Sequence, residues 1–130
     1  MRKDREQLAG LLNLMNGWER ALRRDECGDW LIEGTHGHVY VDGAGFLACV
    51  FPGSTRGWNV AKAKLGRFRA SQDGDQEGCI QVREPTPAEA ETLRQVIGVR
   101  RRRHLAPAQR EAAIARLRLL RQNASNRASV

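Results

Sequence analysis

The hydrophobic period of the chain changes twice, and this change constrains the fold more than any other feature. Apolar residues recur every three or four positions early in the chain, which predicts an amphipathic helix over residues 4–24. Between residues 30 and 83, apolar and polar residues alternate, and Gly, Asp and Pro separate the alternating segments. Helical spacing returns after residue 86. This order of elements predicts an α+β domain.

The alternating region predicts an antiparallel sheet of about five strands. Residues 30–33, 38–41 and 46–51 are expected to form a meander, because turn-forming residues separate them. A short helix over residues 56–65, capped by Ser54 or Thr55, is expected to follow, and residues 67–83 are expected to form a second hairpin. Trp58 is expected to face the core, and the alternative is that it stacks on a nucleic-acid base.

Two helices are expected after the sheet. Thr86-Pro87-Ala88-Glu89 is a capping box with proline at the first helical position, and Gly98 is a natural end for the helix. A last helix is expected from Pro107 to Gln122. We therefore predict one domain over residues 1–122 and a flexible tail over residues 123–130. Because Leu119 lies opposite the main apolar seam of the last helix, this helix also suits a homodimer contact.

The positive charge of the chain is concentrated at its C-terminal end. From residue 100 onward, nine arginines oppose one acidic residue, giving +8, whereas residues 1–99 carry 13 Lys+Arg and 14 Asp+Glu, giving −1; together these make the net +7. This distribution predicts a polyanionic partner. The alternative is compositional: with only three lysines in the chain, a genome rich in G and C would produce the same arginine bias without any binding function.

Arginine binds phosphate oxygens in bidentate geometry, so the arginine-rich connector is the strongest candidate site. A second basic cluster surrounds the short helix and the strand that follows it. The candidate nucleic-acid-binding residues are Arg94, Arg100, Arg101, Arg102, Arg103, Lys62, Lys64, Arg67 and Arg69. We expect a small accessory or regulatory protein that binds DNA or RNA, with DNA preferred. The alternative is a protein-interaction module, or a phage- or plasmid-type inhibitor, that binds an acidic protein partner.

The motifs for catalysis and metal binding are weak, so the sequence favours a protein without a cofactor, a bound metal or enzymatic activity. Asp73 to Glu84 resembles a calcium-binding loop, but Pro85 and Pro87 stand where the exiting helix should continue. A charged hairpin tip is therefore favoured there. His36 and His38, with Asp42, are the residues of a second alternative, a metal-dependent hydrolase, although zinc-ligand spacing is lacking. There is no P-loop, GxGxxG or nucleophile elbow.

The three cysteines are odd in number and widely spaced, which favours a reducing cytoplasm over a disulfide scaffold. No apolar run approaches the roughly 18–20 residues that a membrane span requires, so we expect no membrane partner. The charged N-terminal stretch also lacks the apolar core of a secretion signal.

Several local patterns carry a resemblance to a known group of proteins. These are Trp58-x3-Lys62 with Leu65, Gln72-Asp-Gly-Asp-x-Glu-Gly78, Thr86-Pro-x-Glu-Ala90 and the arginine run. Together they resemble a family of short proteobacterial proteins, over roughly the middle and C-terminal two-thirds of the chain. The resemblance implies no activity. It implies only that the stretch recurs as a unit in chromosomes and mobile elements.

Overall fold

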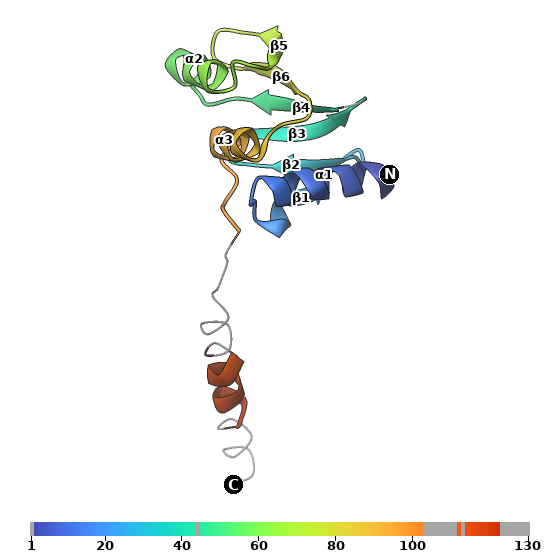
Figure 1. Ribbon diagram of the computed structural model, residues 1–130, viewed down its shortest axis with the longest axis vertical. Helices are drawn as coiled ribbons and strands as arrows, with labels where there is room; N and C mark the ends of the chain where they lie inside the picture. The colour runs from blue at the N-terminus through green and yellow to red at the C-terminus, as the bar shows by residue number, and fades with distance from the viewer. Residues whose placement is uncertain (1, 44, 103–111, 113, 123–130) are drawn as a thin grey trace.

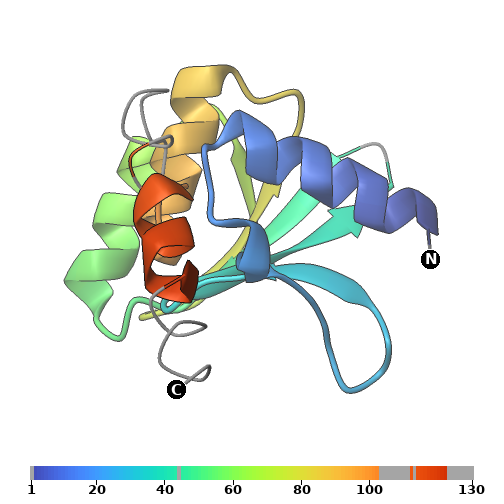
Figure 2. The ribbon, with the colours of Figure 1, turned by 90° about the horizontal axis from the view of Figure 1, so that it is seen from below.

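The computed structural model describes residues 2–43, 45–102, 112 and 114–122. Within this part, one antiparallel sheet is covered on one face by helices (Figures 1 and 2). The α+β prediction is therefore confirmed. The sheet has six strands in the order β1-β2-β3-β4-β6-β5, one strand more than expected.

The elements follow one another in a simple order. They are α1 (Arg2–Leu14), a 3-10 turn (Glu19–Ala21), β1 (Leu22–Arg24), β2 (Trp30–Glu33), β3 (Gly37–Asp42), β4 (Gly45–Val50), α2 (Thr55–Lys64), β5 (Arg69–Asp73), β6 (Gly78–Val82) and α3 (Pro87–Ile97). Residues 112 and 114–122 are also helical. The predicted meander, short helix, second hairpin and C-terminal helices are thus all present.

The predicted helix over residues 4–24 is wrong beyond Leu14. Asn16 adopts the left-handed conformation (φ 55°), Asn16 N donates to Asn13 O, and Gly17 N donates to Leu12 O. These bonds form a Schellman motif, which satisfies the last carbonyls of α1 and ends the helix. Residues 22–24 instead pair with β2 as the edge strand β1. Arg20, Arg23 and Arg24 therefore do not occupy the last turn of a helix.

The core lies between the helices and one face of the sheet. Alternate strand residues such as Ile32, Val39 and Ile80 are fully buried against helical residues such as Leu8 and Leu93. Trp58 is also fully buried, which confirms it as a core residue and leaves it no role in base stacking. Its Nε1 donates a hydrogen bond to Asp73 Oδ1 (2.8 Å), so its polar atom is satisfied.

The opposite face of the sheet carries half-buried residues, among them His38, Tyr40, Cys49 and Cys79. At one end, the turn between β1 and β2 reaches over this face, since Tyr40 Oη donates to Asp25 Oδ2 (3.3 Å). At the other end, a cleft of about 650 Å³ lies between β3 and the β5–β6 hairpin. The sheet is therefore helix-covered on one face and hollowed on the other.

The ends of α3 are those expected from sequence. Thr86 Oγ1 accepts from Glu89 N (3.2 Å), and Glu89 Oε1 accepts from Thr86 N (3.0 Å), which completes the capping box. Gly98 is left-handed (φ 75°), and Val99 N donates to Arg94 O. This second Schellman motif ends α3 and sets the direction in which the arginine-rich segment leaves the helix.

Candidate functional site

The segment that follows α3 is held against the loop that follows α1. Trp18 N donates to Arg100 O (2.8 Å), Gly17 forms an isolated antiparallel bridge with Arg101, and Arg102 N donates to Asn16 O (2.6 Å). The arginine-rich segment is thus an extended stretch fixed by backbone hydrogen bonds up to residue 102. The same Asn16-Gly17 turn that ends α1 supplies its partners.

The described arginines of the run, Arg100 to Arg102, differ in how far their side chains are exposed to solvent. Arg100 and Arg101 are exposed. Arg102 is half-buried, since its Nη1 donates to Asn13 Oδ1 (2.8 Å) and its Nε lies 3.7 Å from Glu19 Oε2. Arg103 lies outside the described residues. Two arginines of the run, Arg100 and Arg101, therefore present exposed guanidinium groups on a fixed backbone.

An aromatic side chain lies between two of these cations. The guanidinium carbons of Arg20 and Arg100 are each 6.0 Å from the centroid of the half-buried Trp18 ring. Both separations are at the outer limit of a cation–π contact. A hollow of about 230 Å³ lies beside them and is lined also by Arg23 and Thr35. We call Trp18, Arg20, Arg23, Arg100 and Arg101 the basic platform.

The basic platform contains three residues that sequence reasoning missed. The predicted helix over residues 4–24 would place Trp18 on its apolar stripe and Arg20 and Arg23 in its last turn. The available signal was Asn16-Gly17, a residue pair suited to a helix end. Among the described residues that line the hollow, one is acidic: Glu33 Oε2 lies 3.6 Å from Arg23 Nη1, which partly neutralises Arg23.

Arg94 does not join this surface. Its side chain is buried, Nη1 donates to Val99 O (3.1 Å), and Nη2 lies 3.7 Å from Glu91 Oε1. Its guanidinium therefore secures the chain leaving α3 rather than facing a ligand.

The second predicted cluster is divided by internal ion pairs. Lys62 Nζ donates to Asp73 Oδ1 (2.8 Å), and this bond, with the one from Trp58, lowers the pKa of Asp73. Arg67 binds Glu89 through two hydrogen bonds (2.7 and 3.0 Å), which raise the pKa of Arg67. Lys64 and Arg69 are exposed. The structure thus engages half of this cluster in holding α2, the hairpin and α3 together.

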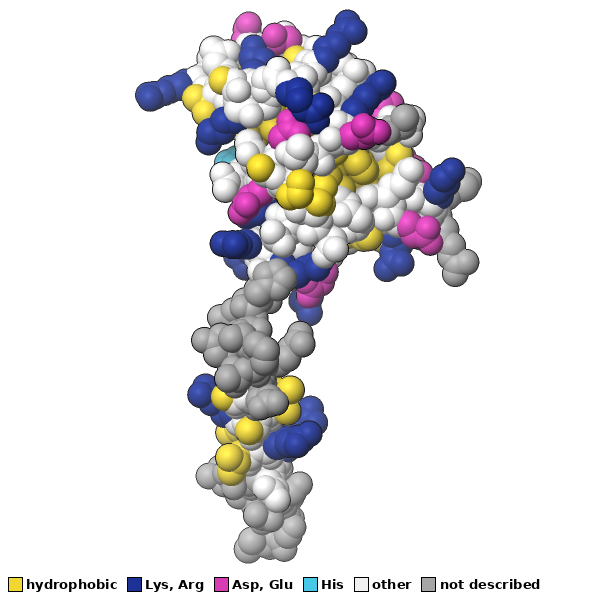
Figure 3. Space-filling view, viewed as in Figure 1, with side chains coloured by type: hydrophobic (Ala, Val, Ile, Leu, Met, Phe, Trp, Pro, Cys, Tyr) yellow, Lys and Arg dark blue, Asp and Glu magenta, His cyan; other side chains and the backbone are white. Residues whose placement is uncertain are grey.

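The last helix adds a separate basic surface. Arg116, Arg118 and Arg121 are exposed, and the described residues of this helix include no acidic side chain. Figure 3 shows dark blue and yellow side chains together on it, without magenta. Leu117, Leu119 and Leu120 are exposed by 60%, 60% and 61%. The predicted start of this helix at Pro107 and the tail over 123–130 lie outside the described residues.

The described residues do not assemble either of the predicted metal sites. Among them, no three His, Cys, Asp or Glu side chains are grouped so that they could hold an ion. Asp73 to Gly78 forms the turn of the β5–β6 hairpin, as the charged-tip interpretation expects. His36 lies before β3, whereas the His38 ring packs against Tyr40 and Phe51 at centroid distances of 5.1 and 5.5 Å.

Comparison of the chain with protein-family models, with curated proteins and with solved structures gave no match. The resemblance to short proteobacterial proteins therefore stays a prediction. Across the described ranges, no helix is both long enough and apolar enough to cross a membrane.

Proposed function

We propose that this protein binds the phosphate backbone of nucleic acid, in the first place DNA, through the basic platform. The supporting observation is that Arg100 and Arg101 are exposed on a segment whose backbone is fixed to the Asn16–Trp18 loop. Fixed cations lose less conformational freedom on binding than cations on a mobile chain. Trp18, beside them, supplies an aromatic edge for a base or sugar.

The last helix extends this proposed surface. Its exposed arginines lie close to the fixed segment in sequence and add charge without acidic neighbours among the described residues. Nucleic-acid affinity of this kind comes mainly from the release of counterions and falls steeply with salt. A cytoplasmic location belongs to this proposal and is supported by three free cysteines.

The test is a DNA titration by fluorescence anisotropy at several salt concentrations. Arg100→Ala/Arg101→Ala is compared with Lys3→Ala/Arg56→Ala, which removes the same charge from exposed positions elsewhere. We expect the platform variant to lose affinity and to reduce the log–log salt slope by about 0.9 per lost phosphate contact. The control is expected to bind nearly as the parent does. Equal losses in both variants would remove the platform from the proposal.

A second candidate function is favoured by the exposed apolar side chains of the last helix. Ile114, Leu117, Leu119 and Leu120 are 44–61% exposed, which is unusual for a helix that functions alone. They suit an acidic protein partner, with the arginines as the polar contact, or a second copy of the chain. Sedimentation of the parent and of Leu117→Gln/Leu120→Gln tests the homodimer. A pull-down after nuclease treatment tests the protein partner.

A further inference from the structure

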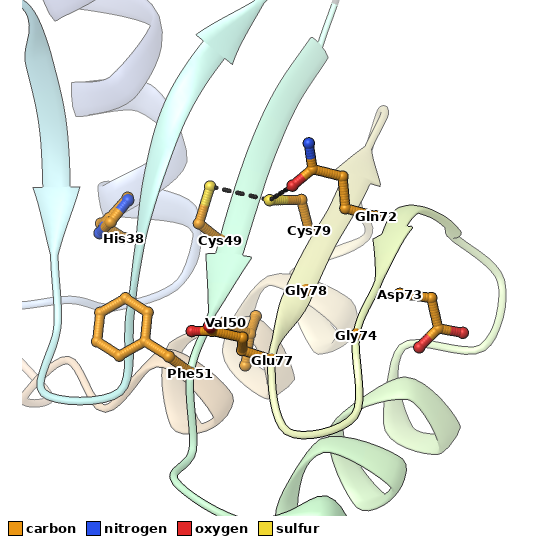
Figure 4. Close-up of a pocket in the computed structure, with 10 residues that line it drawn as sticks. All are labelled: His38, Cys49, Val50, Phe51, Gln72, Asp73, Gly74, Glu77, Gly78 and Cys79. Carbon is orange, nitrogen blue, oxygen red and sulfur yellow. Dashed lines mark hydrogen bonds between the residues drawn. The ribbon is translucent and has the colours of Figure 1, made fainter.

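Two cysteines face each other on the face of the sheet that the helices leave uncovered. Cys49 of β4 and Cys79 of β6 are directly paired in the strand register, and their sulfur atoms are 3.3 Å apart. Figure 4 shows both side chains rising from adjacent strands toward each other, beside the open cleft. Neither cysteine has a role in the proposed nucleic-acid surface.

The strand geometry suits a covalent bond between them. Phe51 N donates to His36 O, so alternate residues of β4, including Cys49, turn their N–H groups toward β3 and away from β6. Cys49 and Cys79 therefore form a non-hydrogen-bonded pair, the type in which Cα atoms approach to about 4.5 Å. That separation lies within the range of about 4.4–6.8 Å that disulfides adopt.

Little movement is needed to close the bond. A disulfide has a sulfur–sulfur distance of about 2.05 Å, so the sulfurs must approach by about 1.3 Å from their present 3.3 Å. Both residues line the cleft of about 650 Å³, which gives a small oxidant access. Burial, and then contact with Cys79, raises the pKa of Cys49 to about 12. Beside Cys79, Cys49 is therefore held in the thiol form.

We propose that Cys49 and Cys79 are a redox-modification site at which a hydroperoxide forms a reversible cross-strand disulfide. The site is independent of nucleic-acid binding. The third cysteine, Cys27, is exposed and belongs to the turn between β1 and β2, away from the pair in sequence and register.

The chemistry proceeds in two steps. The Cys79 thiol gives its proton to solvent, and the thiolate attacks the hydroxyl oxygen of the hydroperoxide. The O–O bond breaks, Cys79 becomes a sulfenic acid, and the leaving oxygen takes up a proton from solvent and departs as water or an alcohol. The Cys49 sulfur then attacks the Cys79 sulfur, and the S–S bond forms as the sulfenic oxygen departs as water with the Cys49 proton. Two thiols are thereby oxidised by two electrons, and one hydroperoxide is reduced. A dithiol reverses the reaction by exchange.

The disulfide would join the central strand β4 to β6. The loop between the two cysteines contains α2 and β5, so oxidation would close a covalent ring around these elements. A ring of this kind restricts the unfolded chain and raises the resistance to denaturant. The oxidised and reduced proteins should therefore differ in their urea midpoints.

The experiment uses the full chain with Cys27→Ser, which leaves the pair as its only thiols. The reduced, folded protein is treated with one equivalent of hydrogen peroxide. We expect both thiols to disappear, the intact mass to fall by about 2 Da, and peptide mapping to join Cys49 to Cys79. The urea midpoint should rise and return to its former value after dithiothreitol.

The matched control is Cys27→Ser/Cys49→Ala, in which oxidation of Cys79 has no neighbouring thiol to complete the bond. It should gain about 16 Da per added oxygen or form covalent dimers. The proposal is overturned if the Cys27→Ser protein behaves in the same way as this control. It is also overturned if the disulfide forms only in urea. That result would show that the folded sheet does not bring the two sulfurs together.

Discussion

The carboxylate of Glu89 has two partners, one inside its helix and one outside it. It accepts from Thr86 N in the capping box, and it accepts two hydrogen bonds from Arg67, which also donates to the carbonyls of Arg83 and Glu84. Arg67 thereby links α3 to the segment between β6 and α3. From the sequence, the capping box was predictable, because its partners are three residues apart. The bond to Arg67 was not, since it spans 22 residues.

The first prediction concerns the pH dependence of this contact. The hydrogen bonds from Arg67 and then from Thr86 lower the pKa of Glu89 from 4.5 to about 2. A carboxyl whose pKa is lowered by folding stabilises the protein above its unfolded pKa and loses this effect as the pH falls through its folded pKa. Glu89→Gln keeps a capping-box residue but removes the charge. We expect a lower urea midpoint at pH 7, and a difference from the parent that closes between pH 4.5 and about 2.

Urea unfolding followed at several pH values measures this difference. Glu6→Gln is the control, because Glu6 is exposed on α1 and loses the same charge. Its midpoint should follow the parent at every pH. If the urea midpoint of Glu89→Gln stays below that of the parent by the same amount near pH 2, the stabilisation does not come from the charge of Glu89.

At the scale of the element, the parts with strong local signals were predictable. Alternation with turn residues defined β2, β3, β4, β5 and β6, and proline and glycine marked both ends of α3. The error lies at the end of α1. The apolar stripe continues through Met15 and Trp18, so periodicity favoured a longer helix than the Asn16-Gly17 turn allows. A three-residue edge strand such as β1 carries too short a pattern to be recognised.

The candidate site was only partly predictable for the same reason. Arg100 and Arg101 stand out in the sequence because they belong to a run. Trp18 and Arg20 come beside them through long-range backbone bonds, such as Trp18 N to Arg100 O. A misplaced helix end therefore concealed three of the five residues of the basic platform. The burial of Arg94 was equally hidden, since it depends on how α3 packs.

Two glycine substitutions test the revised end of α1. Gly10 is inside the helix, and an added Cβ would have nothing within 4 Å, so Gly10→Ala should stabilise the protein by about 1 kcal/mol. Gly17 follows the helix, and a Cβ there would lie 2.4 Å from Leu12 Cδ1 in the core. Gly17→Ala should therefore destabilise the protein by about 1–3 kcal/mol.

Urea unfolding of both variants measures the two effects. They are expected to have opposite signs, although the substitution is the same. If α1 continued through residue 17, both alanines would stabilise the protein, because each would replace a glycine within a helix. Stabilisation by Gly17→Ala would therefore contradict the turn that positions Trp18 and the arginine segment.

At the scale of the whole molecule, the excess of positive charge and the sheet belong to different parts of the chain. Residues 1–99 carry a net charge of −1 and contain every strand that the structure describes, whereas residues 100–130 carry +8. The basic platform lies where these two parts meet, because Arg100 and Arg101 are bonded to the loop after α1. Binding to a polyanion would therefore depend on both parts of the chain, and their contributions should be separable by salt.

The last prediction separates them. Arg116, Arg118 and Arg121 are exposed on the last helix, where the described residues offer no acidic partner. If they contact phosphates, replacing all three by alanine should reduce the log–log salt slope of DNA binding by up to about 2.7, at about 0.9 per contact. Since these residues are exposed and no hydrogen bond or ion pair joins them to the described sheet and its helices, the urea midpoint should stay within error of the parent.

The matched control is the triple variant Arg116→Lys/Arg118→Lys/Arg121→Lys, which keeps the charge but loses the planar guanidinium group of arginine. Counterion release depends on charge, so the lysine variant should retain the parental slope even if its affinity is somewhat lower. A slope that falls equally in the lysine and alanine variants would show that bidentate geometry, and not charge, governs this helix. A slope unchanged in both would confine phosphate binding to the basic platform, and the last helix would then be left with its exposed leucines as a contact for protein.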